Sequence, residues 1–245
     1  MAFLSSYRTA LYFKNNGHCF GGKISTYLTF SIAVILLFRE GFAQRIELSQ
    51  GERVVIVGSG IASRMTKFGH FEAEIYLNFP DKNIQIRNMA DEGNTPGFRP
   101  HPGRHYEYHF AFPGAKELVY EGYRIDTKSQ GHFESPDQWL TRLRADTIIA
   151  FFGYNSSFEG ENGLERYEKE FEGFVKHTPT QRYNGYGPPK LVVVSPTAFE
   201  EKPRNFDGPD GESINRNLEL YTDAMAVIAS NHGVLFVDAF HASKQ

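Results

Sequence analysis

The chain has 245 residues, 22% of them charged, and a formal net charge of −3 at neutral pH. This balance excludes the strongly basic surface of a nucleic-acid-binding protein and fits a globular chain with room for one sizeable core. The only cysteine, Cys19, lies near the amino terminus, so the chain cannot form an internal disulfide.

The first 43 residues have the pattern of a secretory signal peptide. Three basic residues precede an apolar run at 26–38, and the small residues Gly41 and Ala43 follow it. The run is shorter than the roughly 20 apolar residues that a membrane span needs, although an uncleaved signal anchor is the alternative. We therefore expect cleavage after Ala43 and a secreted or periplasmic protein with no membrane contact beyond this leader.

The stretch 54–63 predicts a buried strand that turns sharply into a helix. Four β-branched residues in a row, at 54–57, suit a strand covered on both faces. Gly58 and Gly60 then allow a tight turn with open backbone N–H groups. A helix that begins here directs its positive end at the same place.

The next elements are a helix, a strand and a loop. Apolar residues recur at helical spacing over 61–79, and Pro80 ends this helix. Residues 84–89 predict a second strand, and turn-forming residues fill 88–97.

The segment 98–134 is long, irregular and rich in aromatic residues. It also carries His101, His105, His109 and His132. Without a cysteine partner or a helical pattern, these histidines are expected to face solvent or to line a cleft rather than to bind a metal. The aromatic residues suggest either a surface that stacks on sugars or ordinary core packing.

Helix and strand patterns continue to alternate through the second half of the chain. Ser135 and Pro136 predict a helix start. The later elements are a strand at 146–152, a helix at 164–175, a strand at 191–194, a helix at 214–228 and a strand at 234–238. This alternation predicts an α/β fold, a three-layer α/β/α sandwich around a five-stranded parallel sheet. The single domain, 44–245, is expected to be truncated, because such folds usually add a closing helix after the last strand.

Groups that can donate hydrogen bonds follow three of the predicted strands. They are the turn at 58–60, the loop at 88–93 and the segment 153–155, which ends in Asn155. The carboxyl ends of parallel strands share one edge of the sheet, where ligands bind. Open N–H groups and an asparagine amide there could surround an oxyanion, an effect of about 3–4 kcal/mol for each well-placed donor.

In this order the blocks resemble the SGNH (GDSL-type) hydrolases, and most closely their planctomycete-type secreted members. The resemblance covers nearly all of 51–245, and the blocks that carry it are 58–65, 87–89, 93–95, 151–156, 194–196 and 237–240. It implies the flavodoxin-like SGNH fold and ester hydrolysis. In such a reaction a serine of the first block attacks the acyl carbon, and a histidine of a late Asp-x-x-His block takes its proton. Carried over residue by residue, the resemblance places Gly93 and Asn155 in the oxyanion roles.

Two positions depart from the family pattern. The Gly-Asp-Ser block aligns with Gly58, Ser59 and Gly60, so the nucleophile position falls on Gly60. Ser59, one residue earlier, is either a displaced nucleophile or a structural turn serine. Asp238 and His241 match the Asp-x-x-His spacing but directly adjoin the last strand. They are either the catalytic pair or a strand-end aspartate with an incidental histidine.

The sequence therefore predicts a hydrolase of ester bonds without a cofactor, which acts on a small-molecule or carbohydrate ester, for example by deacetylation. One alternative is a glycan-binding module that has lost its nucleophile. A more distant alternative is a dinucleotide-binding oxidoreductase, because 58–63 resembles the Gly-x-Gly-x-x-Gly/Ala pattern. That pattern requires an acidic residue at the end of the second strand, where this chain has Arg87 and Asn88.

Overall fold

The computed structural model describes residues 46–119, 130–200 and 210–244. The predicted signal peptide lies outside these residues. Within them, no helix is both long enough and apolar enough to span a bilayer.

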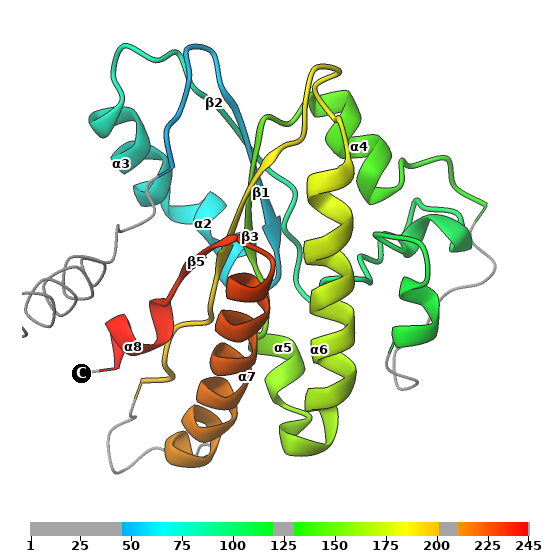
Figure 1. Ribbon diagram of the computed structural model, residues 1–245, viewed down its shortest axis with the longest axis vertical. Coiled ribbons are helices and arrows are strands. Elements are labelled where there is room, and N and C mark those ends of the chain that lie inside the picture. The colour runs from blue at the N-terminus through cyan, green and yellow to red at the C-terminus, as the bar shows by residue number, and fades with distance from the viewer. Residues whose placement is uncertain (1–45, 120–129, 201–209, 245) are drawn as a thin grey trace, which may run out of the picture. The chain divides into compact units, whose positions relative to one another are not determined.

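The core of the fold is a sheet of five parallel strands in the order β2-β1-β3-β4-β5 (Figure 1). This confirms the predicted parallel sheet. The order is that of flavodoxin-like folds and differs from the 3-2-1-4-5-6 order of most dinucleotide-binding domains, which argues against the oxidoreductase alternative. The strands are β1 (Arg53–Gly58), β2 (Gln85–Asn88), β3 (Thr147–Phe151), β4 (Lys190–Val194) and β5 (Leu235–Val237).

The register brings the carboxyl ends of the strands level with one another. Gly58 pairs with Phe151, Phe151 pairs with Val194, and Val194 pairs with Val237. On the other side of β1, β2 ends at Asn88. The segments that follow the strands therefore begin along one edge of the sheet.

Helices cover both faces, as the sequence predicts. Because crossovers between parallel strands are right-handed, the step from β1 to β2 places its helices on one face, and the three later steps place theirs on the other. Ala62 packs on the first face, and Leu140 and Phe171 pack on the second. Figure 1 shows α6 and α7 side by side in front of the sheet. The helices are α2 (Gly60–Phe68), α3 (His70–Asn78), α4 (Pro136–Leu143), α5 (Tyr154–Ser157), α6 (Gly160–His177), α7 (Gly211–Asn231) and α8 (Ala239–Ser243).

The single helix predicted for 61–79 is wrong. Gly69 adopts a left-handed conformation with φ of 64° and divides the segment into α2 and α3. Its N–H bonds to the carbonyl of Met65, which is a common way for a helix to end. Phe68, one of the apolar residues of this segment, is 68% exposed. The glycine ends the helix because it adopts this conformation without steric cost.

Two short helices were not predicted. The helix α5 begins three residues after β3, and α8 begins two residues after β5.

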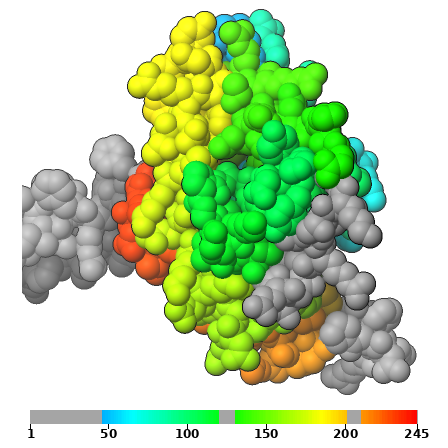
Figure 2. Space-filling view, turned by 90° about the vertical axis from the view of Figure 1, so that its right-hand side faces the viewer, coloured from blue at the N-terminus to red at the C-terminus, as the bar shows by residue number. Residues whose placement is uncertain are grey.

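The described part of the irregular segment, 98–119 and 130–134, contains two short 3-10 helices, η1 (Tyr106–His109) and η2 (Ala115–Leu118). Phe112 and Ala115 are buried in the same core as Phe174 of α6. Figure 2 shows the teal and green residues of this segment on the surface next to the yellow-green ones of α6. His109 is buried and its ring lies 6.0 Å from that of Phe98, so the expectation of a solvent-facing or cleft-lining residue is wrong for this histidine.

Candidate functional site

The corner after β1 is held against β3. The N–H of Ser59 donates a 3.0 Å hydrogen bond to the carbonyl oxygen of Phe151, which continues the strand pairing by one residue. Gly58 has φ of 142°, and a Cβ at this position would lie 2.3 Å from the same oxygen. Only glycine fits here, because both the backbone angle and the close approach exclude a side chain.

Ser59 is the N-cap residue of α2, and its hydroxyl makes no capping hydrogen bond. The residue is 3% exposed. The adjacent Gly60 lies on a pocket, and a Cβ added there would meet no atom within 4 Å. The structure therefore leaves room for a side chain at Gly60, whereas Ser59 is buried and does not line this pocket.

The loop after β2 is bound to this corner. The carbonyl oxygen of Gly58 accepts hydrogen bonds from the N–H of Asp91 at 3.1 Å and from the side-chain amide of Asn94 at 3.2 Å. Gly93, the predicted oxyanion donor, lies between these two residues with φ of 83°. The loop is therefore positioned beside Ser59, although Gly93 itself is not among the residues that line the pocket.

Beyond Gly93 the same loop is anchored in the core by Glu170 of α6. The hydroxyl of Thr95 and the N–H of Gly97 both donate to the Glu170 carboxylate, the second at 2.9 Å. Burial raises the pKa of this carboxyl, although the hydrogen bonds from Thr95 and Gly97 oppose the shift. No local pattern in the sequence identifies Glu170, because its role depends on a contact with Thr95, which lies 75 residues earlier in the chain.

Asn155 lies in α5, directly after β3. The preceding turn residue, Gly153, has φ of 100°, and a Cβ there would come within 3.1–3.2 Å of Met225, Pro196 and Tyr167. This close packing fixes where α5 begins. Asn155 is half-buried and lines the same pocket as Gly60.

This rim pocket has a volume of about 560 Å³, which is in the range of small-molecule sites. Arg64 and Glu92 form an exposed ion pair of 3.7 Å at its edge. The sequence places the segments of these two residues along one edge of the sheet, but the pairing of Arg64 with Glu92 follows only from the tertiary structure. The lining residues are Gly60, Ile61, Arg64, Glu92, Tyr154, Asn155, Thr197, Ala198, Phe199 and Glu200.

The Asp-x-x-His segment lies at the other side of the sheet, after β5. Asp238 is the N-cap of α8, and its carboxylate accepts from the N–H of His241 at 2.9 Å and contacts His241 Nδ1 at 2.7 Å. The other ring nitrogen, Nε2, lies 3.4 Å from Glu219 of α7. The hydrogen bond to Asp238, then the one to Glu219, raise the pKa of His241. Both ring nitrogens thus face carboxylates, and the described residues place no histidine in contact with Ser59.

Ser195, in a block that resembles the family, holds this second corner together. Its hydroxyl oxygen accepts hydrogen bonds from the N–H groups of Ala239 at 2.9 Å and Phe240 at 3.0 Å. These are orphan donors at the start of α8, so Ser195 acts as a cap from a neighbouring strand.

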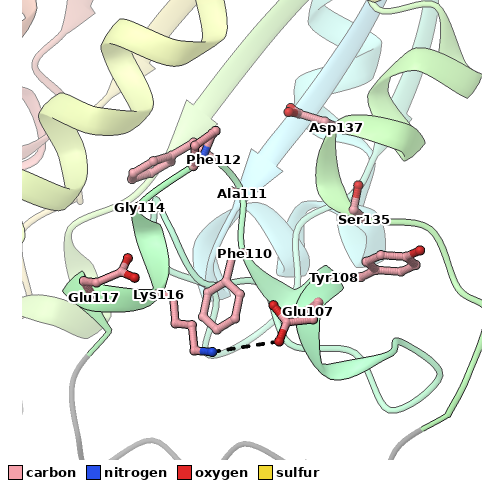
Figure 3. Close-up of a pocket in the computed structure, with 11 residues that line it drawn as sticks. Glu107, Tyr108, Phe110, Ala111, Phe112, Gly114, Lys116, Glu117, Ser135 and Asp137 are labelled. Carbon is pink, nitrogen blue, oxygen red and sulfur yellow. Dashed lines mark ion pairs between the residues drawn. The ribbon is translucent and has the colours of Figure 1, made fainter.

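A second pocket of about 420 Å³ lies in the irregular segment. Figure 3 shows Tyr108 and Phe110 on its walls and the 3.8 Å ion pair between Lys116 and Glu107 at its mouth. Asp137 of α4 forms another part of the lining. Among the residues that the structure describes, no group of three or more histidine, cysteine, aspartate and glutamate side chains could hold a metal ion.

No protein-family model and no curated protein matches the sequence significantly. Solved structures do match. A catalytic mutant of an acetylxylan esterase from Geobacillus stearothermophilus is 14% identical with a TM-score of 0.50, and the match covers 80% of each chain. A candidate GDSL-like lipase from Parabacteroides merdae is 12% identical with a TM-score of 0.50, over 79% of each chain.

The chain has the fold of these esterases. A candidate arylesterase from Agrobacterium tumefaciens is also similar, with 16% identity, a TM-score of 0.46 and coverage of 76% of this chain and 83% of that one. At the low identities of the first two structures, the likeness shows a shared α/β fold and no more.

Proposed function

We propose that the chain is an SGNH-type hydrolase of ester bonds, and that the rim pocket binds the acyl ester of a small molecule or carbohydrate. The observation that carries this proposal is the meeting of three loops at one corner. The carbonyl of Gly58 binds the loop of Gly93, the N–H of Ser59 binds the end of β3, and Asn155 shares a pocket with Gly60.

In this proposal Ser59 is the nucleophile, and Gly93 and Asn155 donate hydrogen bonds to the oxyanion. Asn155 is half-buried where it lines the pocket, which suits such a donor because hydrogen bonds to a developing charge are strongest where water is excluded. The narrower assignment, a planctomycete-type secreted enzyme that removes acetyl groups from carbohydrate, rests on the sequence resemblance and on the ester that one structural neighbour acts on, acetylated xylan.

The test is turnover of p-nitrophenyl acetate and acetylated xylooligosaccharides by the full chain. Ser59→Ala should abolish turnover, and Asn155→Ala should lower kcat/KM by about 10²–10³-fold. Ser63→Ala, a neighbouring serine on α2, is the matched control and should keep the wild-type rate. If the wild type has no activity, the hydrolase proposal fails. Full activity of Ser59→Ala would remove only the assignment of the nucleophile.

A second candidate function is a glycan-binding module without catalysis. Two observations favour it: His241 faces carboxylates on both sides, and the pocket of Figure 3 offers Tyr108 beside an ion pair. Aromatic rings beside charged groups suit the apolar faces and hydroxyls of a sugar. Calorimetry with xylooligosaccharides should then show binding that Tyr108→Ala removes and that Tyr186→Ala, an exposed tyrosine outside this pocket, leaves intact.

Gly60 separates the two candidates. The open space there admits a serine without rearrangement, and Gly60→Ser supplies the side chain that the family has at this position. Turnover that appears only in Gly60→Ser would identify the wild type as the binding module. Wild-type turnover that Gly60→Ser lowers would place the substrate against this residue and support the hydrolase.

A further inference from the structure

A smaller pocket lies on the other side of the loop after β2. Its volume is about 180 Å³. At roughly 30 Å³ for each water, this is space for about six water molecules. It is too small for an oligosaccharide and large enough for a single charged group. It is lined by Asn88, Met89, Ala90, Asp91, Asn94, Arg99, Pro100, His101, Arg104 and Trp139.

Arg99 brings a buried positive charge to this pocket. The residue is 4% exposed, and its guanidinium lies 5.4 Å from the ring of Phe152 and 5.2 Å from that of Phe174. It donates to the carbonyl of Pro96 at 3.3 Å, whereas its Nε has no hydrogen-bond partner among the described residues. Burial lowers the pKa of Arg99 to about 10. A buried charge with so few partners is costly unless something else compensates it.

Arg104 brings a second buried positive charge to the pocket. It is 3% exposed and donates from Nε to the carbonyl of Glu134 at 2.6 Å and from Nη1 to the carbonyl of Arg99. Its guanidinium also lies over the rings of Phe133 and Trp139, at 5.2 and 5.8 Å. Burial, and then the charge of Arg99, lower the pKa of Arg104 to about 10.

The carboxylates near these arginines have other partners. Asp137 contacts His177 Nε2 at 2.7 Å and accepts from the hydroxyl of Tyr183 at 2.6 Å. Glu170 accepts from Thr95 and Gly97, and its pKa is raised. Within the described ranges, neither Arg99 nor Arg104 forms an ion pair with a carboxylate.

Two further charged or titratable groups line the pocket. The exposed Asp91 attracts Arg104 without forming an ion pair, and it would repel a bound anion. His101 is half-buried, and burial followed by the charge of Arg104 lowers its pKa, which favours the neutral ring. The two arginines therefore give the pocket an excess of positive charge over its one carboxylate.

We propose that this pocket binds a small oxyanion, a carboxylate or a phosphate group, at the guanidinium groups of Arg99 and Arg104. The planar guanidinium has several donors that match the oxygens of such groups. A bound anion would compensate the buried charges that the protein itself leaves without an ion pair. This site is separate from the rim pocket, and the inference does not depend on whether that pocket hydrolyses esters.

The experiment is calorimetry and thermal unfolding of the full chain with phosphate, acetate or glucuronate, against chloride at equal ionic strength. At least one anion should bind saturably and raise the Tm, and the comparison of phosphate with the two carboxylates identifies the ligand class. Arg104→Gln should weaken this binding at least tenfold. Asp91→Asn should tighten it severalfold, because it removes the opposing charge. Arg142→Gln, an exposed arginine on α4, is the control and should leave it unchanged.

The opposite results would overturn the proposal. One such result is that none of these anions binds saturably, either to the wild type or to Asp91→Asn. The other is that Arg142→Gln weakens binding as much as Arg104→Gln does. If Arg104→Gln does not fold, Asp91→Asn still decides, because the exposed Asp91 side chain accepts one local hydrogen bond, from the N–H of Glu92, and asparagine keeps that acceptor. Unchanged or weaker affinity in Asp91→Asn would then contradict the site.

Discussion

The corners after β1 and β5 carry the residues that the sequence resemblance assigns to ester hydrolysis, and the two corners differ in what these residues contact. The β1 corner has a pocket, the loop of Gly93 and Asn155, but no histidine hydrogen-bonded to Ser59 among the described residues. The β5 corner has Asp238 and His241, and there Asp238 is the N-cap of α8. Three strand spacings separate β1 from β5, which is about 14 Å at about 4.8 Å each.

This difference shows that spacing in the sequence does not establish a catalytic role. An Asp-x-x-His segment is also what an aspartate N-cap followed by a histidine in the first turn produces. At the β5 corner the hydrogen bonds of Asp238 and Ser195 go to the backbone of α8. At the β1 corner the polar contacts join loops from three different strands. Residues from three of these segments line the rim pocket.

The largest expected loss of stability comes from a substitution in the β1 corner itself. Gly58→Ala should lower the free energy of unfolding by about 3–5 kcal/mol, because its Cβ would overlap the carbonyl of Phe151 and its φ of 142° is strained for alanine. Gly60→Ala, two residues away in open space, should change stability by about 1 kcal/mol or less. Urea denaturation of both variants measures the difference, and equal stabilities would show that the corner is not as tightly packed as described.

The next largest effect is expected from a substitution that frees the loop of Gly93 from the core without changing a residue of the rim pocket. Glu170→Ala removes the buried acceptor of Thr95 and Gly97 and should cost about 2–4 kcal/mol. Glu170→Gln keeps an acceptor and should cost less than half of that. A small effect of the alanine variant in urea denaturation would mean that the loop is held elsewhere.

Glu170 also makes a prediction about pH. Because burial raises its pKa above 4.5, the protonated carboxyl contributes stability below that pH, and the contribution is lost as the pH rises through the raised pKa. Between about pH 4 and about pH 7, the wild type should therefore lose stability relative to Glu170→Gln. A parallel pH dependence of the two proteins would contradict the raised pKa.

A smaller effect is expected at the β5 corner. Ser195→Ala leaves the N–H groups of Ala239 and Phe240 without their acceptor and should cost about 1–2 kcal/mol. Ser230→Ala, on the exposed side of α7, should stay within about 0.5 kcal/mol of the wild type. Chemical denaturation compares the two. If both serines proved equally dispensable, Ser195 would not be the cap of α8.

The smallest expected effect concerns the pairing of His241. Asp238→Asn should move the pKa of His241 down toward 6.5, because the hydrogen bond to Asp238 is the main cause of its raised value. The charged ring contributes stability below pH 6.5, and this is lost as the pH rises through the raised pKa. NMR titration of His241 measures the shift. Glu212→Gln, elsewhere on α7, is the control, and an equal shift in both variants would exclude a specific pair.

Much of the fold follows from local patterns in the sequence. The run of β-branched residues at 54–57, the alternation of strand and helix, and Ser135 with Pro136 at the start of α4 were sufficient to predict five parallel strands between helical layers. The structure even shows the reciprocal cap between Ser135 and Gln138. Gly69 was the missed local signal, since a glycine at that point is the ordinary end of a helix.

Tertiary structure alone decided which of these residues meet. The sequence by itself determined the strand ends and the residues that follow them, because backbone preference and apolar periodicity act over a few neighbouring positions. Contacts such as Gly58 with Asn94 or Thr95 with Glu170 depend on strand order and register, which bring together residues tens of positions apart. The same long-range packing buries Arg99 beside Phe152 and brings Glu219 of α7 to the Nε2 of His241.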